Sequence, residues 1–415
     1  MSRRESTVNS EVSNIKENSS SIWRNKVFSY FFLASCISLI GNSMVTLVLP
    51  LWVMKITNSP LLVSGVNIAI ATAAILFAPI TGTLADRMSR RKLMIVADVI
   101  RGIVMILIAV IAFNNKMLYI LLLLLLIIRS LGSSLFTPAS NAALVTYVEE
   151  KHIQQAITLR QISVQIISVA IPVMASFLIS IFSFHGVFVL DALTFFISFL
   201  ILMKIKFPRE LKVEKKKPFY EDFKEGFSII NNNNNKSLKT LLMSAAVINL
   251  LGAACMLSLQ VIVVREMDLS TQWYSIVFAV SPIGILIGAF ITKKIRAYKT
   301  ITTAFIFTAI MGIFNAAMGT TLNPILFSVY YFLSGIAFGV SNVYFGVLYR
   351  KLIPNEVQGR FYGLLNSLLL VSTPVGIAIT GYSLESISAS ILFIIIGIIT
   401  FLVSVISCLI MNKSR

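Results

Sequence analysis

Gly82-Thr83-Leu84-Ala85-Asp86-Arg87-Met88-Ser89-Arg90-Arg91-Lys92 is the stretch that decides how this chain folds. Its last seven residues hold one acid and four bases, and apolar runs flank it at about 62–84 and 93–113. Each run is long enough to cross a bilayer, which takes about 20 apolar residues. Two spanning helices joined by a basic turn place that turn on the cytoplasmic side of a membrane.

Asp86 is the unusual residue of this turn. It lies at the C-terminal end of the second predicted span, where the helix dipole disfavours an anion. Either the neighbouring Arg87, Arg90 and Arg91 or the positive N-terminus of another helix must offset that cost. By charge alone, a solvated loop that obeys the positive-inside rule remains the alternative.

The composition of the whole chain is that of an integral membrane protein. Its 415 residues are 57% hydrophobic and 13% charged, and the mean hydropathy of +0.88 is outside the range of soluble domains. Twelve spans of about 20 residues with short loops would use the whole length. We therefore predict an all-α integral membrane fold, with twelve transmembrane helices in two six-helix halves.

The hydrophobic runs set the predicted domain boundaries. They give a cytoplasmic leader over 1–26, a six-helix bundle over 27–206, a cytoplasmic linker over 207–237, a second six-helix bundle over 238–411 and a cytoplasmic tail over 412–415. Within the linker, phenylalanines spaced four residues apart suit an amphipathic segment on the inner leaflet, with an ordinary flexible linker as the alternative. The first 22 residues are polar, which predicts no cleaved signal peptide.

The net charge of +18 could suggest nucleic acid as a partner, but its distribution excludes that. Of the 35 Lys and Arg residues, 30 fall on one predicted face of the membrane, and only Lys55, Lys116 and Arg265 fall on the other. This asymmetry is the positive-inside rule. It predicts a multi-pass protein of the plasma membrane with both termini in the cytoplasm.

Cysteine and histidine usage predicts neither a metal site nor an active site. Cys36, Cys255 and Cys408 all fall within apolar spans and make no disulfide framework. His152 and His185 are isolated in predicted loops. We expect no metal, no cofactor and no enzymatic activity, because no His/Asp/Glu or Ser/His cluster exists.

Four charged residues are predicted inside the membrane. Asp98 and Arg101 are three apart on one helical face, which predicts a partly buried ion pair at the cytoplasmic gate in preference to a substrate site. Arg129 lies near the middle of its span, where an arginine is a functional candidate and pairing with an acid is the competitor. An external turn at 183–186 leads into the sixth span, which puts Asp191 about 7 Å into the bilayer from outside.

The spans also contain polar residues that are costly to expose to hydrocarbon, and we expect these to face a cavity. The candidates are Asn42, Asn67, Gln165, Asn249 and Gln260.

The second half of the chain repeats the first weakly. At an offset of 206 residues, Gly82 maps onto Gly288 and Arg87 onto Lys293, whereas Asp86 maps onto Thr292. A six-helix unit duplicated in parallel orientation is the plan expected when two halves surround a site at the membrane midplane.

The string Gly-x-x-x-Asp-Arg-x-x-Arg-Arg-Lys resembles motif A of the major facilitator superfamily of transporters, with Ser89 where glycine is usual. Arg129 to Gly132 resembles motif B, and the antiporter motif of the fifth span is degraded to Ile171-Pro172. Arg-Ser-Leu-Gly-x-x-x-x-Thr-Pro-Ala, Asp191-Ala-Leu-Thr-Phe and Ile-Pro-Asn-Glu-x-x-Gly-Arg360 resemble the macrolide-efflux branch. Siderophore exporters and lysophospholipid transporters lie nearby.

The resemblance implies a conformational gate and a coupling site. The gate would comprise Gly82, Asp86, Arg87, Arg90 and Arg91, together with the Asp98–Arg101 pair. In the family the motif A acid stabilises the outward-facing state, which would set Asp86 against the helix start near Asn355. Arg129 and Asp191 would couple transport to protons, since burial in a low-dielectric site favours the neutral form of a carboxyl group. An Asp191 that merely anchors the start of its helix is the alternative.

The function implied is secondary efflux of an amphipathic small molecule by alternating access, driven by proton antiport. Its partners would be the small molecule, the proton and the lipid bilayer, and we expect a monomer. The alternatives are a lysophospholipid or siderophore transporter of the same fold, or a non-transporting membrane receptor. An intact motif A favours a cycling transporter.

Overall fold

A computed structural model describes residues 22–114, 118–205, 236–295, 300–353 and 358–413. Most of the predicted leader and nearly all of the predicted linker lie outside these ranges. Every regular element within them is helical: η1 Ile22–Arg24, α2 Lys26–Thr57, α3 Pro60–Arg87, α4 Arg90–Phe113, α5 Tyr119–Thr146, η2 Glu150–His152, α6 Ile153–Lys204, α8 Lys236–Val261, η3 Ile262–Glu266, α9 Thr271–Ile291, α10 Thr300–Met318, α11 Pro324–Leu352, α12 Gln358–Ser383 and α13 Ala389–Lys413.

Eleven of the described helices are long and apolar enough to cross a membrane. One of them, α6, has 52 residues, and at 1.5 Å per residue it would be about 78 Å long, more than twice the thickness of the hydrocarbon core. Its backbone leaves the helical region at Ser183, with φ 57° and ψ 179°. Because α6 folds back there, it supplies two spans, and the all-α membrane fold predicted from the sequence is confirmed.

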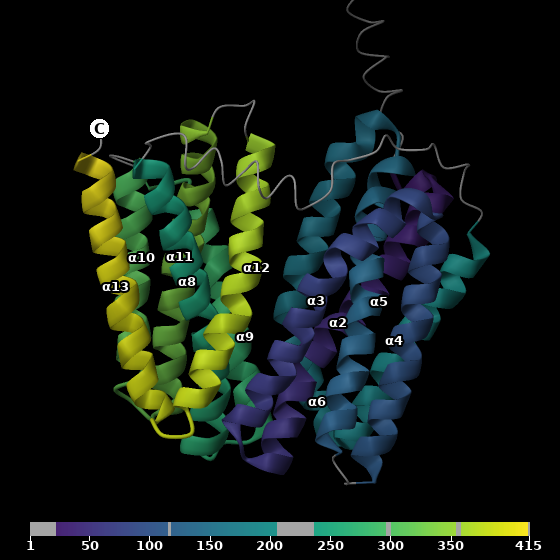
Figure 1. The fold of residues 1–415 in the computed structure, drawn as a ribbon, viewed down its shortest axis with the longest axis horizontal. Helices are drawn as coiled ribbons and strands as arrows, with labels where there is room; N and C mark the ends of the chain where they lie inside the picture. Colours follow the sequence, from purple (N-terminus) through teal and green to yellow (C-terminus); the bar gives the residue numbers. More distant parts are fainter. Residues whose placement is uncertain (1–21, 115–117, 206–235, 296–299, 354–357, 414–415) are drawn as a thin grey trace, which may run out of the picture.

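The helices form two side-by-side bundles (Figure 1). The first bundle contains α2 to α6, in which α2 and α4 both pack on α6 and α3 packs on α5. The second contains α8 to α13, in which α10 packs on α11 and α13 and α9 packs on α11. The 206-residue offset seen in the motif relates the helix bounds of the two bundles to within about one turn; α5, for example, maps onto α11. The repeat therefore extends over all six spans.

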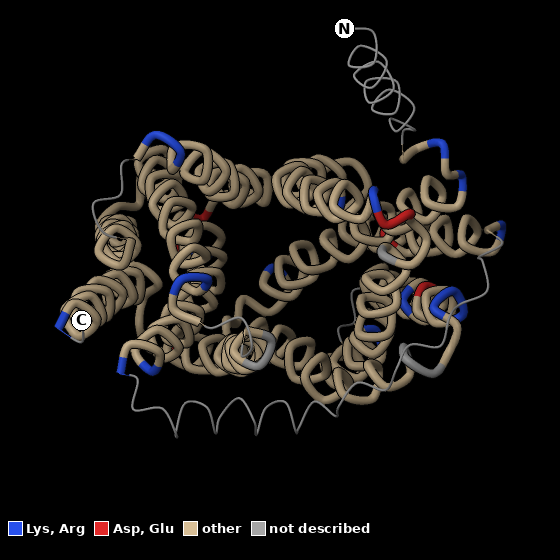
Figure 2. Tube along the Cα trace, turned by 90° about the horizontal axis from the view of Figure 1, so that it is seen from above, with Lys and Arg blue, Asp and Glu red and all other residues tan. Residues whose placement is uncertain are grey.

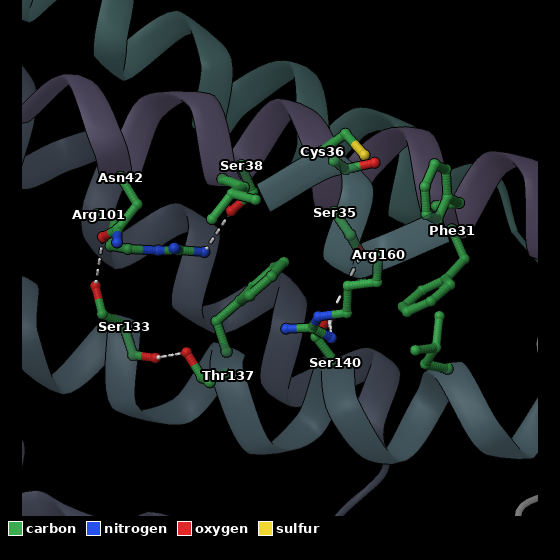
Figure 3. Close-up of a pocket in the computed structure, with 15 residues that line it drawn as sticks. Phe31, Ser35, Cys36, Ser38, Asn42, Arg101, Ser133, Thr137, Ser140 and Arg160 are labelled. Atoms are coloured by element: carbon green, nitrogen blue, oxygen red, sulfur yellow. Dashed lines mark hydrogen bonds between the residues drawn. The ribbon is translucent and has the colours of Figure 1, made fainter. Parts of the chain in front are cut away.

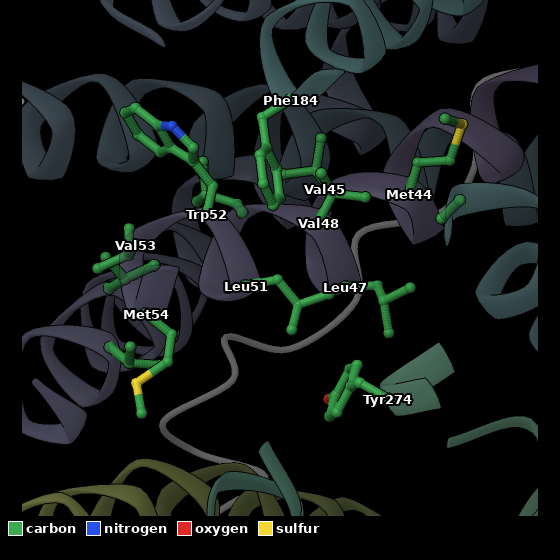
Figure 4. Close-up of a cluster of buried hydrophobic side chains, with 14 of the residues drawn as sticks. Met44, Val45, Leu47, Val48, Leu51, Trp52, Val53, Met54, Phe184 and Tyr274 are labelled. Carbon is green, nitrogen blue, oxygen red and sulfur yellow. The ribbon is translucent and has the colours of Figure 1, made fainter. Parts of the chain in front are cut away.

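A single large apolar cluster joins the bundles at the end opposite the described chain ends. It combines residues of α2 between Met44 and Met54 with residues of α8 between Leu257 and Val261 and with Tyr274 of α9. Figure 4 shows the Tyr274 ring beside Leu47 and Leu51. Lipid is as apolar as these side chains, so close packing and not the hydrophobic effect holds the helices together here.

Near the chain ends, the apolar clusters stay within one bundle each. One is built from α2, α4, α5 and α6 of the first bundle, and the others combine helices of the second bundle only. Figure 1 shows the ribbons of α3 and α12 diverging toward this end. The two halves are thus joined at one end by a shared core and are separately packed at the other.

A polar contact reinforces the joined end. Glu385, which follows α12, accepts hydrogen bonds from the Ser59 hydroxyl group at 2.9 Å and from the Leu61 backbone N–H at 3.2 Å. Both donors belong to the N-terminus of α3, where the helix dipole favours an anion. A carboxylate of the second half therefore binds the N-terminus of a helix of the first half.

Candidate functional site

Asp98 and Arg101 of α4 form a buried ion pair. Nη2 of Arg101 lies 2.5 Å from Oδ1 of Asp98, and the two side chains are 3% and 0% exposed. The carboxylate also accepts hydrogen bonds from the hydroxyl groups of Ser38 on α2, at 3.3 Å, and Ser198 on α6, at 2.7 Å. The pair predicted from the three-residue spacing is present, but it is buried completely and joins three helices.

Arg101 is held in place by aromatic rings and by a glycine. Its guanidinium carbon lies 4.4 Å from the ring centre of Phe136 and 4.5 Å from that of Phe195. A Cβ atom at Gly132 of α5 would lie only 2.9 Å from Cγ of Arg101. The cation–π contacts and the close approach at Gly132 fix this arginine between α5 and α6.

Arg129 of α5 also lies near the ring of Phe195. Its guanidinium carbon is 5.9 Å from that ring centre, and its Nη2 donates a hydrogen bond of 3.1 Å to Oδ1 of Asn42 on α2. The Ser133 hydroxyl group donates to the same oxygen at 3.3 Å. Asn42, predicted as a cavity residue, is therefore also the hydrogen-bond partner of the predicted coupling arginine.

Asp191 of α6 completes the group, which we name the charge network: Asp98, Arg101, Arg129 and Asp191. The carboxyl group interacts electrostatically with Arg129 and Arg101, is 1% exposed, and has no hydrogen-bond partner on either oxygen among the described residues. A Cβ atom at Gly41 of α2 would lie 2.7 Å from its Oδ1. A buried carboxyl group without hydrogen bonds is costly, which marks this position as a functional candidate.

The structure gives the position of Asp191 along its helix. The helix resumes directly after Ser183, so Asp191 lies about 12 Å from that start. That is too far from the start of the span to cap its first turn. The sequence also predicted two separate pairs, a gate pair and a coupling pair, whereas the structure joins all four residues in one network.

Two cavities in the first half border this network. The smaller, of about 80 Å³, is lined by Arg101, Arg160 and several hydroxyl groups (Figure 3). The larger, of about 440 Å³, is lined by Arg129, Ser130 and Gly82. Asn42 and Ser133 line both. We name them the small and large polar cavities, and the charge network lies against each through one arginine.

The second half contains a cavity of different character. It measures about 560 Å³ and is lined by Asn249, Asn342, Phe345 and Tyr349, among others. Oδ1 of Asn249 accepts hydrogen bonds from Ser372 at 2.8 Å and Thr373 at 2.9 Å. No charged residue is among the described residues that line this second-half cavity.

A fourth cavity, of about 1120 Å³, lies between the halves. Its walls come from α5 and α6 of the first half, including Gln165, and from Leu286 and Phe290 of α9. Phe290 is the penultimate residue of α9 and Arg160 lies near the start of α6, so this interface cavity is at the separately packed end.

The five predicted cavity residues divide into two groups. Asn42, Gln165 and Asn249 line cavities. Asn67 instead donates to the Val63 carbonyl oxygen of its own helix at 3.2 Å, and Gln260 is 3% exposed, with its Nε2 unpartnered among the described residues. The structure places neither Asn67 nor Gln260 on the four cavities above.

The basic residues of the predicted gate bind helix ends within the first half. Arg90 donates to the Ala142 carbonyl oxygen of α5 at 3.2 Å and to Thr146. Arg91 donates to the carbonyl oxygens of Leu202, at 3.0 Å, and Met203, at 2.6 Å, at the end of α6. Cations stabilise helix C-termini, so these arginines tie α4 to two neighbours. The side chains of Asp86 and Arg87, and the segment near Asn355, lie outside the described residues.

Arg160 is the residue that sequence reasoning missed. It was counted only among the 30 basic residues of the predicted cytoplasmic face. In the structure α6 begins at Ile153, so Arg160 lies about 10 Å inside the helix. It lines both the small polar cavity and the interface cavity. The apolar residues that continue the helical pattern before it were the available signal.

Comparisons with known proteins give a consistent result. The family model described as Major Facilitator Superfamily matches residues 31–373. The uncharacterized MFS-type transporter YfiS of Bacillus subtilis (strain 168) is 28% identical over 93% of this chain and 94% of its own length. Macrolide efflux protein A of Streptococcus pyogenes is 22% identical over 95% and 97%.

Solved structures show the same fold. A bacterial homologue of the iron transporter ferroportin in an inward-facing state matches with a TM-score of 0.72 at 16% identity, over 95% of this chain and 99% of that one. A bacterial homologue of the human lysosomal transporter Spinster, inward-facing and unoccupied, matches with a TM-score of 0.70 at 16% identity, over 95% and 99%. At these identities the likeness concerns the fold alone.

Proposed function

The chain belongs to the major facilitator superfamily of transporters, and we propose that it exports an amphipathic small molecule by alternating access in exchange for protons. The transporter fold, and not an enzyme fold, is what the family and the structural neighbours have in common. Efflux is supported by the macrolide efflux proteins among the relatives.

The observation that carries the proposal is the carboxyl group of Asp191, which lies beside Arg101 and Arg129 and has no hydrogen-bond partner among the described residues. When all four residues of the charge network are ionised, its net charge is zero. A proton on Asp191 would leave two guanidinium groups facing only Asp98. Because a buried charge imbalance is costly, proton binding would change which arrangement of α2, α4, α5 and α6 is favoured.

The one-sided core supports alternating access. The shared apolar cluster and the Glu385 contact close one end, whereas the interface cavity lies at the other. Figure 2 looks onto the side of the molecule on which the described chain starts and finishes, and Lys and Arg lie at many helix termini there. We assign that end to the cytoplasm of a plasma-membrane protein, so the substrate would enter from the cytoplasm. The protein would act as a monomer.

Transport into vesicles tests the proposal. The full chain is reconstituted into liposomes with an acidic lumen, and candidate amphiphiles come from a susceptibility panel in a host that lacks its own pumps. We expect accumulation of a substrate above equilibrium, and its collapse when a protonophore is added. Accumulation that is unchanged by the protonophore would show that transport is not coupled to protons. Binding without any transport would identify a receptor, and preferential movement of a lysophospholipid or siderophore would identify those alternatives.

A further inference from the structure

The charges that line the four cavities all have one sign. Arg101 and Arg160 line the small polar cavity, Arg129 lines the large one and Arg160 also lines the interface cavity. Among the described lining residues of these cavities there is no Asp or Glu. We propose that the transported ligand is an amphipathic anion whose charged group binds at Arg160. This inference rests on the proposed transport function and names its substrate class.

Arg160 is the arginine left without an acidic partner. Arg101 is neutralised by Asp98 at 2.5 Å, and Arg129 faces Asp191. In the described part of the chain, no carboxylate forms an ion pair with Arg160. Its guanidinium group donates a long hydrogen bond of 3.4 Å to the Ser140 hydroxyl group. A cation inside the membrane is energetically costly unless an anion or water interacts with it. Arg160 therefore places a positive charge without a described acidic partner at the edge of two cavities.

The surroundings of Arg160 suit an anionic group. Figure 3 shows its guanidinium group beside Ser140, with Ser35 next to it. The hydroxyl groups of Ser35 and Ser140 are 3.4 Å apart, and Ser163 lines the same cavity. A guanidinium group binds carboxylate and phosphate oxygens in a fixed planar geometry, and hydroxyl groups can donate to the remaining oxygens.

The interface cavity beside it suits an apolar body. Its walls include Leu144 and Ile157 of the first half and Leu286 and Phe290 of the second. Its volume of about 1120 Å³ exceeds what a drug-sized ligand needs. Because Arg160 lines both cavities, a ligand could bind its charged group there and place its apolar part between the two halves. Closure of the halves would then enclose the ligand.

A cationic amphiphile would meet the opposite situation. It would approach an unpaired guanidinium group without any described acid on the cavity wall to compensate, and like charges in a weakly polar cavity repel. Export of an anion also moves negative charge outward, which an inside-negative membrane potential assists. Both considerations favour an anionic ligand.

Equilibrium binding to the full chain in lipid nanodiscs tests the proposal. Three probes share one alkyl chain: dodecyl phosphate, dodecanol and dodecylammonium. Naphthalenesulfonate is a fourth probe that stays in water, and binding to empty nanodiscs is subtracted. We expect at least one of the two anions to bind about 10-fold or more tightly than dodecylammonium, because hydrogen bonds to a charged group are the strong ones. If dodecyl phosphate is the only anion that binds, the ligand enters from the bilayer. If naphthalenesulfonate also binds, the ligand can enter from water.

Three variants locate the site. Arg160→Gln should abolish the preference for the anion, Arg160→Lys should keep part of it, and Lys204→Gln, an exposed base of the same helix, should keep all of it. Elution volume and helical circular dichroism must match the wild type. Equal or tighter binding of dodecylammonium or dodecanol by the wild type would overturn the proposal, as would an anion preference that survives in Arg160→Gln.

The binding experiment separates this inference from the proposed function. A protein that pumps a cation uphill keeps the proposed function and contradicts the anionic ligand. A protein that binds the anion through Arg160 but moves nothing across the membrane supports the ligand class and contradicts transport.

Discussion

The two halves follow one helix plan but differ in what lies between their helices. Among the described residues, every buried charged side chain belongs to the first half: Arg90, Asp98, Arg101, Arg129 and Asp191. At the 206-residue offset, the four positions of the charge network correspond to Ala304, Phe307, Gly335 and Gly397. Where charged side chains bridge helices in the first half, small or apolar residues take their place in the second.

The glycines bring helix backbones of the second half into direct contact. A Cβ atom at Gly335 of α11 would lie 2.5 Å from the Ser281 carbonyl oxygen of α9. At Gly397 of α13 it would lie 2.3 Å from the Ala316 nitrogen of α10. Small residues that permit such contact are the usual basis of helix association in membranes. The comparison teaches that, among the described residues, the first half buries titratable side chains between its helices, whereas the second half packs neutral ones there.

The largest expected effect comes from removing the titratable group. Asp191→Asn should abolish uphill transport, because asparagine cannot exchange a proton and leaves Arg101 and Arg129 permanently with one carboxylate. Downhill equilibration of substrate should continue. Proteoliposome uptake with and without a pH gradient measures both. Asp268→Asn, which changes an exposed acid outside the network, is the matched control. A well-expressed Asp191→Asn protein that still pumps uphill would remove Asp191 from the mechanism.

A pair of alanine substitutions tests the contrast between charge bridging and backbone contact. Gly335→Ala should destabilise the protein by about 1–3 kcal/mol, because the new methyl group meets backbone that cannot move aside. Proton coupling in the surviving protein should be normal. Gly132→Ala instead meets Cγ of Arg101 at 2.9 Å and the Ala97 carbonyl oxygen at 3.1 Å, so it would displace the guanidinium group from its place in the charge network.

We expect the opposite profile for Gly132→Ala, with a smaller loss of stability and a clear loss of coupling. Thermal unfolding in detergent measures the first quantity, and the ratio of protons released to substrate moved measures the second. If both variants lose stability and coupling in the same proportion, the halves do not differ as charge-bridged and backbone-packed bundles.

Substrate binding by the second half should weaken when the side-chain amide of Asn249 is removed. Asn249→Ala should weaken substrate binding by about 2- to 10-fold, which corresponds to one lost hydrogen bond. The proton dependence of transport should not change. Asn67→Ala is the matched control, since Asn67 lines none of the four cavities. Substrate titrations at two pH values distinguish the variants, and an equal effect of both would refute a recognition role for Asn249.

The smallest effect is expected at the closed end. Glu385→Gln removes a carboxylate from the N-terminus of α3, an interaction of about 0.3–1 kcal/mol at an exposed site. The population of the state open at that end should rise by about 2- to 5-fold. Distance distributions between spin labels at the exposed positions 55 and 268 report the change. Glu149→Gln, an acid in the loop before α6, should have no effect, and an unchanged distribution for Glu385→Gln would contradict the closing role.

The fold was accessible from the sequence because its signals are local. Apolar runs, the charge asymmetry and the basic turn at 82–92 each depend on a few neighbouring residues. The Asp98–Arg101 pair was predictable for the same reason, since a spacing of three residues fixes the two side chains on one helical face.

The composition of the site was less accessible. Asn42 and Asn67 are the same residue type in neighbouring spans, yet one binds Arg129 and lines two cavities while the other bonds within its own helix. Arg160 was counted only with the basic residues of the cytoplasmic face, and the tertiary structure places it on two cavities. Helix rotation and packing, which sequence patterns define poorly, decided all three cases.

The sequence by itself determined that this chain crosses the membrane many times, which end of each span is basic and which residues carry charge within the spans. Hydrophobicity and net charge are sums over neighbouring residues, so no tertiary contact is needed to read them. The tertiary structure alone decided that Asp191 meets Arg101 and Arg129, that Arg160 has no acidic partner among the described residues, and that the halves share a core at one end only. Those facts depend on how far each helix slides and turns against its neighbours, and that is fixed by close packing between residues distant in the chain.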